Sequence, residues 1–424
     1  MELQSLQPLA QQLFADVRAL TFDGVGVTRA SYGEGENACA AYLDTFARQE
    51  GLEVVTDRAG NFIYFDPTDT RTTPAIWSGS HLDSVPQGGN YDGLAGVVAG
   101  LLVLIAAKRA GTTLPAPLKV IGFRGEESAW FGKAYMGSGA LWGKLSCADL
   151  ELQRRGDAIS LREAFKACGA DVDAIGRQEK LFNPADVLAY VELHIEQGPV
   201  MVAREIPVGV VSGIRGNVRH NKIECFGEAQ HSGVVPRWLR KDAVFAVSDL
   251  IVRVDNHWRA LLERGTDLVV TCGVVQTNPA EHSISRVPGY AHFSFEARSK
   301  SSDTLEAFYQ LVQAEMNSIE RERGVQFKAD RRLLSEPAVT DPHLCDLMAK
   351  ACRDRGIAHE RIPSGAGHDA ALFANGGIPS AMVFVRNQNG SHNPYEAMEL
   401  SDFMLGTQVM ADTIAAITPR AASH

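Results

Sequence analysis

Three apolar runs along the chain are continuous rather than alternating: residues 117–123 (PLKVIGF), 186–194 (DVLAYVELH) and 379–386 (PSAMVFVR). Runs of this length are typical of strands that are buried on both faces of a sheet. Helical patterns lie between them, at residues 93–110, 160–169 and 369–377. Strands that alternate with helices in this way predict an α/β fold with helices flanking a largely central sheet.

The middle of the chain has a different pattern. Residues 291–299 (AHFSFEARS) alternate strictly, with Phe293, Phe295 and Ala297 on one face and polar residues on the other. Such alternation predicts a sheet that is buried on one face only. Further strands are expected at residues 221–227 and 267–275, and amphipathic helices at about 237–264 and 303–323. We therefore predict a small α+β domain at residues 215–331, inserted into a larger domain formed by residues 1–214 and 332–424.

Composition narrows the classes of protein to consider. A chain of 424 residues is long for one core, which agrees with two domains. Its formal net charge of −10 argues against a nucleic-acid partner or an anionic membrane surface. The longest apolar run, residues 93–107, is shorter than the roughly 20 residues of a membrane span, so it is expected to form a buried helix. Seven scattered cysteines without a C-x-x-C pair, and an N-terminal segment that reads as a helix rather than a signal peptide, favour the cytoplasm.

Residues that can bind a metal follow the predicted strands of the larger domain. His81 follows AIWSGS, Glu126 and Glu127 follow KVIGFRG, His194 closes VLAYVELH, and His392 follows AMVFVRNQNGS. Open α/β sheets bind ligands at the carboxyl ends of their strands. The glycine-rich loop after His81 adds Asp92. Any single histidine is more often structural than a ligand, but the coincidence of four strand ends favours a metal site.

The types of these residues suggest which metals would bind. Imidazole and carboxylate ligands together suit Zn²⁺, Mn²⁺, Co²⁺ or Ni²⁺ better than Ca²⁺ or Mg²⁺. Two histidines alone could hold one ion, whereas three histidines with a bridging carboxylate suit two ions. Of the adjacent pair Glu126 and Glu127, one is expected to bind an ion and the other to act as general base, because neighbours in an extended segment point in opposite directions. Asp83 is expected to orient the His81 ring.

A family resemblance adds to this interpretation. The chain resembles the hydantoinase/carbamoylase amidases, which are M20-type dinuclear zinc amidohydrolases, over roughly residues 5–415. The motifs that carry the resemblance, in chain order, are GSHLDSVPQGGNYDGLAGV, RGEES, ELHIEQGPV, GEAQHSGVVPRWLRKDA, ISRVPG, EARSKSSD, GAGHDAALFA and GSHNPYEAMEL. The resemblance implies a zinc-exopeptidase-like catalytic domain with a mixed sheet, and an inserted domain that serves as lid and dimerisation domain.

The resemblance also assigns roles by position. It implies two divalent ions per chain, Zn²⁺ first among the candidates, held by the set His81, Asp92, Glu127, His194 and His392. His81 and His194 would hold one ion, Glu127 and His392 the other, and Asp92 would bridge. Glu126 matches the catalytic base and Gln197 a substrate-contacting residue. His231 matches an oxyanion-stabilising histidine and Arg298 an arginine that binds the substrate carboxylate, both reaching the site from the partner subunit of a homodimer.

Three positions depart from the family pattern or stay ambiguous. Ser285 stands where the family often has asparagine, and Ser128-Ala129-Trp130 replaces a common Gly-Ser-Arg segment. Both changes lie at positions that bear on substrate identity, because a serine hydroxyl lacks the reach of an amide. Asp369, with His368 at the start of a predicted helix, could cap that helix or touch substrate; capping is the favoured interpretation.

The expected activity is hydrolysis of a non-peptide C–N bond in a small carboxylate-bearing substrate. The first hypothesis is cleavage of the carbamoyl (ureido) bond of an N-carbamoyl amino acid, with release of amino acid, CO₂ and ammonia. The alternative is hydrolysis of N-acyl amino acids or dipeptides on the same site. His194, where many such relatives have an acidic ligand, favours the first. A binding protein without catalysis is disfavoured because the base and all five ligands are present.

Overall fold

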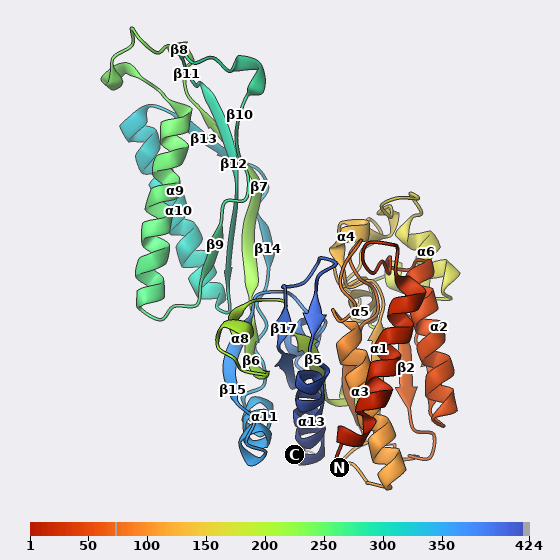
Figure 1. Ribbon diagram of the computed structural model, residues 1–424. Coiled ribbons are helices and arrows are strands. Elements are labelled where there is room, and N and C mark those ends of the chain that lie inside the picture. The colour runs from red at the N-terminus through yellow and green to blue at the C-terminus, as the bar shows by residue number, and fades with distance from the viewer. Residues whose placement is uncertain (73, 419–424) are drawn as a thin grey trace. The chain divides into compact units, whose positions relative to one another are not determined.

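The computed structural model describes residues 1–72 and 74–418 and divides into two compact units (Figure 1). Among these residues, the first unit comprises those up to residue 212 and those from residue 339 onward, and the second comprises residues 213–338. Each unit is built on its own sheet and has its own apolar core.

The first unit contains a mixed sheet of eight strands. Their order is β1 (Glu53–Thr56), β2 (Phe62–Phe65), β4 (Leu118–Phe123), β3 (Ala75–His81), β5 (Val187–Ile195), β16 (Ser380–Val385), β6 (Val208–Ile214) and β15 (His359–Ser364). The four central strands β4, β3, β5 and β16 are parallel, whereas β1, β2 and β6 run antiparallel to their neighbours. The four predicted strand ends therefore meet at one edge of the sheet.

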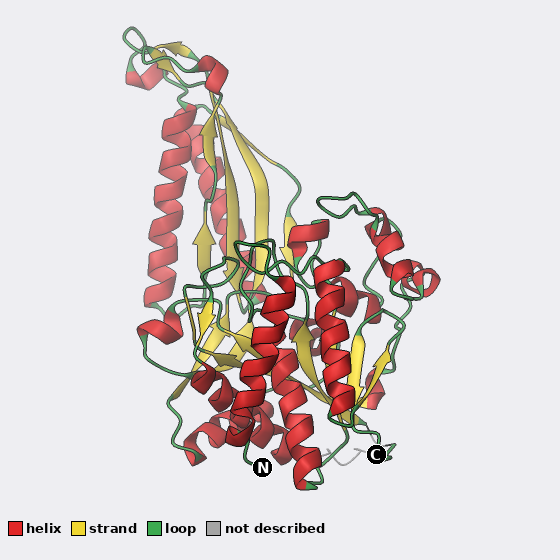
Figure 2. Cartoon of the chain, turned by 45° about the vertical axis from the view of Figure 1, so that its right-hand side comes forward, coloured by secondary structure: helices red, strands yellow, loops and turns green. Residues whose placement is uncertain are grey.

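One face of this sheet is covered by helices that share a single aliphatic core. Those helices are α1 (Gln7–Thr21), α2 (Glu34–Gln49), α3 (Leu94–Ala110), α11 (Pro342–Asp354) and α13 (Leu400–Ala416). Helix α3 is buried from Leu94 to Ala107, as its apolar sequence predicts. It packs against β3, β4 and β5, and α1 packs against α2, α3 and α13 (Figures 1 and 2).

Aromatic residues fill the other face. The rings of Tyr190 on β5 and Phe373 on α12 (Ala370–Asn375) stack with their centroids 4.2 Å apart. Trp77 and Phe123 lie against Phe373 as well. Since Val191 belongs to the aliphatic core, successive residues of β5 are buried on opposite faces, which explains why the strand is continuously apolar from Val187 to Val191.

The second unit is an antiparallel sheet with two long helices along it (Figure 2). The two central strands are β7 (Gly216–Phe226) and β12 (Tyr290–Ser299), and they pair with the outer strands β9 (Val269–Thr271), β10 (Val275–Thr277), β13 (Gln326–Ala329) and β14 (Leu333–Ser335). Phe293, Phe295 and Ala297 are buried against α9 (Ala243–Glu263) and α10 (Ser302–Arg323), as the alternation predicts.

Helix α9 begins later than predicted. The expected start was about residue 237, but residues 237–239 form only a short 3₁₀ turn. Asp242 accepts hydrogen bonds from the N–H groups of Val244 and Phe245 and so fixes the first turn at Ala243. Over the described residues, no helix has the length and apolar character that crossing a membrane requires.

Candidate metal centre

Two histidines reach the same place because of strand register. Trp77 of β3 pairs with Tyr190 of β5, and four residues further along each parallel strand stand His81 and His194. Side chains repeat every two residues, so both imidazoles emerge on the same face at the carboxyl edge. Gly93 has φ of 68°, and its position has no room for a side chain, because a Cβ there would stand 2.4 Å from Nδ1 of His81.

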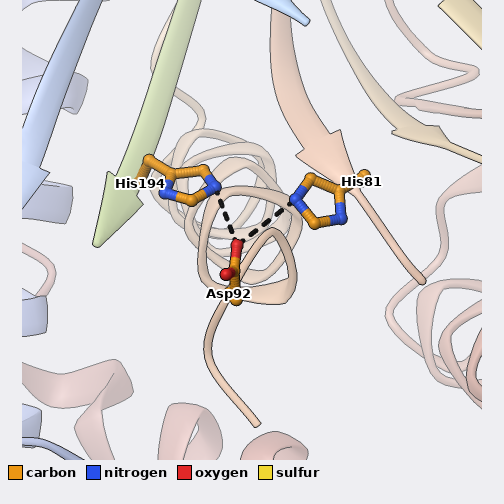
Figure 3. Close-up of side chains that lie close together, drawn as sticks. All are labelled: His81, Asp92 and His194. Carbon is orange, nitrogen blue, oxygen red and sulfur yellow. Dashed lines mark ion pairs between the residues drawn. The ribbon is translucent and has the colours of Figure 1, made fainter. Parts of the chain in front are cut away.

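Asp92 lies between these two imidazoles (Figure 3). Its Oδ1 is 3.4 Å from Nε2 of His81 and 3.2 Å from Nε2 of His194. Its other oxygen, Oδ2, is 3.5 Å from Nε2 of His392, and that nitrogen is 3.3 Å from Oε1 of Glu127. The two oxygens of one carboxylate thus face two different groups of ligands.

The tautomers of the two buried histidines follow from their other ring nitrogens. Nδ1 of His81 lies 3.1 Å from the carbonyl oxygen of Asp83, and Nδ1 of His194 lies 2.9 Å from that of Ile195. Carbonyl oxygens only accept, so each Nδ1 carries a proton, which leaves the Nε2 of each ring as the atom that can bind a cation beside Asp92. Within the described part of the chain, Nε2 of His194 and Oδ1 of Asp92 are buried without a hydrogen-bond partner.

This arrangement fits a pair of divalent cations. Lone pairs and a carboxylate oxygen that converge repel one another unless a positive charge lies between them. Two ligand atoms at about 2.0–2.1 Å from one tetrahedral ion are about 3.3–3.4 Å apart, close to the observed separations. The ligand atoms of His81, Asp92 and His194 lie within 4.8 Å of one another, as do those of Asp92, Glu127 and His392. We call these sets the first and the second ligand group.

Asp83 holds the glutamate pair in place. Its Oδ1 accepts the N–H of Glu126 at 3.0 Å, and its Oδ2 accepts that of Glu127 at 3.1 Å and the hydroxyl of Ser31 at 2.6 Å. Oδ1 also lies 3.3 Å from Nδ1 of His81. Burial alone would raise the pKa of Asp83, but these partners, His81 first, lower it below the ordinary value.

Glu126 is nearly buried, and burial raises the pKa of its carboxyl well above the ordinary value, with a further contribution from the charge of Glu127. The expectation that the two glutamates diverge was wrong. Residues 125–127 lie outside any strand, so alternation does not apply, and ligand atoms of His81, Glu126 and Glu127 come within 4.8 Å of one another. The division of roles between Glu126 and Glu127 stays a prediction.

Gln197 also borders the centre. Its backbone has φ of 63°, and its N–H donates to Oδ1 of Asn387 at 2.9 Å. The side-chain Nε2 donates to Oδ2 of Asp92 at 2.8 Å. Its Oε1 is buried with no hydrogen-bond partner in the described residues. An unsatisfied amide oxygen beside the ligands suits a group that meets substrate, but that role stays a prediction.

Three predicted residues lie in the second unit. His231 in β8 (Gln230–His231) pairs with Arg286 of β11 (Arg286–Val287), and the N–H of Ser232 donates to the carbonyl of Ser285 at 2.8 Å. Nδ1 of His231 accepts the N–H of Gly233 at 3.1 Å. Its Nε2 therefore carries the proton and can donate a hydrogen bond.

Arg298 lies far from this pair. Its guanidinium makes two hydrogen bonds of 3.0 Å to the carboxylate of Glu296. β11 joins the Tyr290 end of β12, whereas Arg298 stands near the other end (Figure 1). At roughly 3.3 Å per residue, the strand from Tyr290 to Arg298 spans about 26 Å. One copy of this unit cannot place both His231 and Arg298 on one small molecule.

Sequence reasoning assigned Asp369 wrongly. Its carboxylate makes no capping hydrogen bond and instead accepts the hydroxyl of Ser138 at 2.5 Å. The cap of α12 comes from Glu192 of β5, which accepts the N–H of Ala370 at 3.0 Å. This partner is distant in sequence, so no local pattern could predict it. His368, whose ring centroid is 4.4 Å from that of His194, lies beside the first ligand group.

Trp130, one of the departures from the family pattern, donates its indole N–H to the carbonyl of Ser84 at 2.7 Å. Two more residues near the centre went unrecognised in the sequence, Ser391 and Glu396, although both lie in the GSHNPYE motif. Ser391 Oγ is 2.6 Å from Oδ2 of Asp92 and 2.6 Å from Oε2 of Glu396. A carboxylate four residues after a candidate ligand was the available signal.

The chain is similar to known proteins over most of its length. Residues 77–416 match the model of the peptidase family M20/M25/M40. The chain is 33% identical over 390 residues to an N-carbamoyl-L-amino acid amidohydrolase of Geobacillus stearothermophilus, covering 92% of this chain and 93% of that protein. It is 31% identical over 366 residues to an allantoate amidohydrolase of Escherichia coli (strain K12), covering 85% of each.

Solved structures give the same result. A hydantoinase/carbamoylase family amidase from Burkholderia multivorans superposes with a TM-score of 0.87 at 26% sequence identity, covering 97% of each chain. The motifs, the fold and these similarities agree, and the chain belongs to the peptidase family M20/M25/M40, within the hydantoinase/carbamoylase amidases.

Proposed function

We propose that this protein is a metal-dependent amidohydrolase that cleaves the ureido C–N bond of N-carbamoyl amino acids, giving amino acid, CO₂ and ammonia. The observation that carries the proposal is the convergence of three imidazole Nε2 atoms on the two oxygens of Asp92, with the carboxyl of Glu126 beside them. Two similar proteins are named as amidohydrolases of N-carbamoyl-L-amino acids and of allantoate. These names favour a ureido substrate over an N-acyl amino acid.

The first ligand group would hold one divalent ion and the second another, with Asp92 shared between them. The mixed imidazole and carboxylate donors favour Zn²⁺, and Mn²⁺, Co²⁺ and Ni²⁺ suit the same donors. When bound, such ions act as Lewis acids toward the substrate carbonyl and make water more acidic. The carbonyls of Asp83 and Ile195 keep His81 and His194 in the tautomer that binds a cation.

Glu126 would transfer a proton from the attacking water to the departing nitrogen through its carboxylate. Burial raises the pKa of Glu126, which strengthens its carboxylate as a base toward the attacking water. Asp83 fixes the backbone of Glu126 and so limits where the carboxylate can reach.

Substrate recognition is assigned to Gln197, His231, Ser285 and Arg298. The protonated Nε2 of His231 would donate to the oxygen that gains negative charge as water adds to the carbonyl. The planar guanidinium of Arg298, which already holds a carboxylate in Glu296, would pair with the substrate carboxylate. Ser285 joins the segment of His231 through a backbone hydrogen bond and is placed beside it for that reason.

The separation along β12 supports a homodimer with composite sites. His231 and Arg298 lie too far apart in one copy of the second unit to serve one substrate, so two copies must contribute if both residues act. This refines the expectation that both residues come from the same partner. One would come from the chain that supplies Glu126 and the other from its partner.

A substrate panel tests the proposal. The metal-loaded protein is incubated with N-carbamoyl α- and β-amino acids, allantoate and N-acyl amino acids, and release of ammonia and of free amino acid is measured. The Glu126→Gln variant is the control for contaminating activity. We expect ammonia from at least one ureido substrate. Hydrolysis of N-acyl amino acids without ammonia from any ureido compound would contradict the proposal.

A further inference from the structure

Glu396 joins two of the segments that carry ligands of the second group, the loop of Asp92 and the loop of His392. Its Oε1 accepts the backbone N–H groups of Tyr91 at 2.8 Å and of Asp92 at 3.3 Å. Its Oε2 is 2.6 Å from the hydroxyl of Ser391, which is in turn 2.6 Å from Oδ2 of Asp92. One buried carboxyl therefore ties the loop of Asp92 to the loop of His392 across most of the sequence.

The Asp92 loop is shaped around this carboxyl. A Cβ on Gly89 would stand 2.0 Å from Cδ of Glu396 and 2.2 Å from its Oε1, so any side chain there would displace it. The loop thus leaves room for the carboxyl to reach the N–H groups. Such a close fit between segments far apart in sequence indicates that the buried contact between Glu396 and this loop is a fixed part of the fold.

The His392 loop needs such a tie. Asn389 and His392 both have left-handed backbones, with φ of 65° and 60°, a conformation that is uncommon for residues other than glycine, although asparagine and histidine adopt it more readily than most. The side chain of His392 is 52% exposed, so packing contributes little to its position. His81 and His194, in contrast, are buried within paired strands.

We infer that Glu396 is a positioning residue for the second ion: it sets the spacing between Asp92 and His392 and so determines the affinity of the second ligand group. The inference rests on the two-ion centre proposed above. The first ligand group depends much less on Glu396, because strands β3 and β5 hold its two histidines. Loss of Glu396 should therefore weaken binding of the second ion more than binding of the first.

Calorimetric titration of the metal-free protein with Co²⁺ tests the inference without an activity assay. Wild type should bind two ions. Glu396→Ala should weaken one of them by about 10–100-fold, the usual effect of removing a partner of a ligand. Glu396→Gln should stay near wild type, since its amide oxygen can accept the same N–H groups. Ser391→Ala, a milder change in case Glu396→Ala does not fold, should weaken the same ion.

Paired backgrounds identify the ion. In the His392→Ala background only the first ion should bind, and adding Glu396→Ala should leave its Co²⁺ affinity unchanged. In the His194→Ala background only the second ion should bind, and adding Glu396→Ala should lower its Co²⁺ affinity. Asp242→Ala is the matched control, because Asp242 is another buried carboxylate that accepts two backbone N–H groups, at the start of α9. That variant should still bind two ions with wild-type affinity.

The outcomes separate the inference from the proposed function. If wild type binds two ions and both Glu396→Ala and Ser391→Ala bind them unchanged, the positioning role is overturned and the two-ion centre stands. Equal weakening of both ions also overturns it, because the effect would then be a general loosening of the fold. A wild-type chain that binds a single ion overturns both.

Discussion

His194 and Asp92 face each other across 3.2 Å, from Nε2 to Oδ1, and within the described residues neither of these buried atoms has a hydrogen-bond partner. Folding should not favour such a pair on its own, since an unpaired buried acceptor costs about 1–3 kcal/mol. Burial lowers the pKa of His194, but the carboxylate of Asp92 raises it above the ordinary value. The cost is therefore offset by a proton on Nε2 or by a metal ion that both atoms bind, and the pair is suited to hold a cation.

The Glu126→Gln variant separates ion binding from catalysis. Glutamine has nearly the same shape but cannot accept the proton of water, and loss of a general base costs about 10²–10⁴-fold in rate. We expect kcat to fall by that factor while the metal content, measured by mass spectrometry, stays that of wild type. A variant with near-normal kcat would assign the proton transfer to another group.

Mixing two impaired variants, assayed at a substrate concentration far below the KM of either, tests the composite site. In a heterodimer of His231→Ala and Arg298→Ala chains, one of the two sites has both residues intact if they come from different chains, whichever of them comes from the partner. Random exchange of subunits should then restore about a quarter of wild-type activity. The comparison is each variant exchanged with itself. With exchange verified, absence of recovery would mean that both residues come from the same chain or that one of them does not serve the site.

Arg298→Ala should act on substrate binding more than on the chemistry. Removing one partner of a buried charge pair costs roughly 2–5 kcal/mol, so KM for a carboxylate substrate should rise steeply with a smaller change in kcat. Arg298→Lys should recover little, because an ammonium lacks the planar fork. Steady-state kinetics decide this; an unchanged KM would remove Arg298 from substrate binding.

A stability prediction concerns the buried ion pair of Arg124 and Glu36, which lies next to the segment that carries Glu126 and Glu127. Nη2 of Arg124 lies 2.6 Å from Oε2 of Glu36, and both side chains are almost fully buried. Arg124→Met leaves the carboxylate buried without its charge partner and should destabilise the first unit by about 3–5 kcal/mol. Denaturant unfolding measures the change. Adding Glu36→Gln should recover part of it; no recovery would mean that lost packing, not the unpaired charge, is responsible.

Much of the fold was predictable because its signals are local. Continuous apolar runs predicted three of the parallel strands, among them the one that carries His194, and strict alternation predicted the buried face around Phe293. The candidate ligands were also predictable, since strand ends meet at one edge of a parallel sheet. The start of α9 was misplaced because the capping by Asp242 outweighs the apolar pattern before it.

Contacts between distant segments were beyond local reasoning. Glu192 caps α12 across 178 residues of sequence, and Glu396 reaches Tyr91 across 305. Local sequence patterns reveal neither pairing; for Glu396 the only signal is its place four residues after His392. The convergence of Glu126 and Glu127 was missed for a related reason: both backbone N–H groups donate to Asp83, which lies more than 40 residues earlier in the chain, and the pair follows the end of β4 rather than lying in a strand.

The count of ions in the active protein tests the central claim most directly. The metal-free protein is loaded with Zn²⁺, freed of excess, and analysed for metal per chain together with activity on the best ureido substrate. We expect two ions per fully active chain, loss of activity on chelation, and loss of one ion in each of the variants His194→Ala and His392→Ala. Full activity with no more than one ion per chain would contradict the two-ion centre that Asp92 is proposed to bridge.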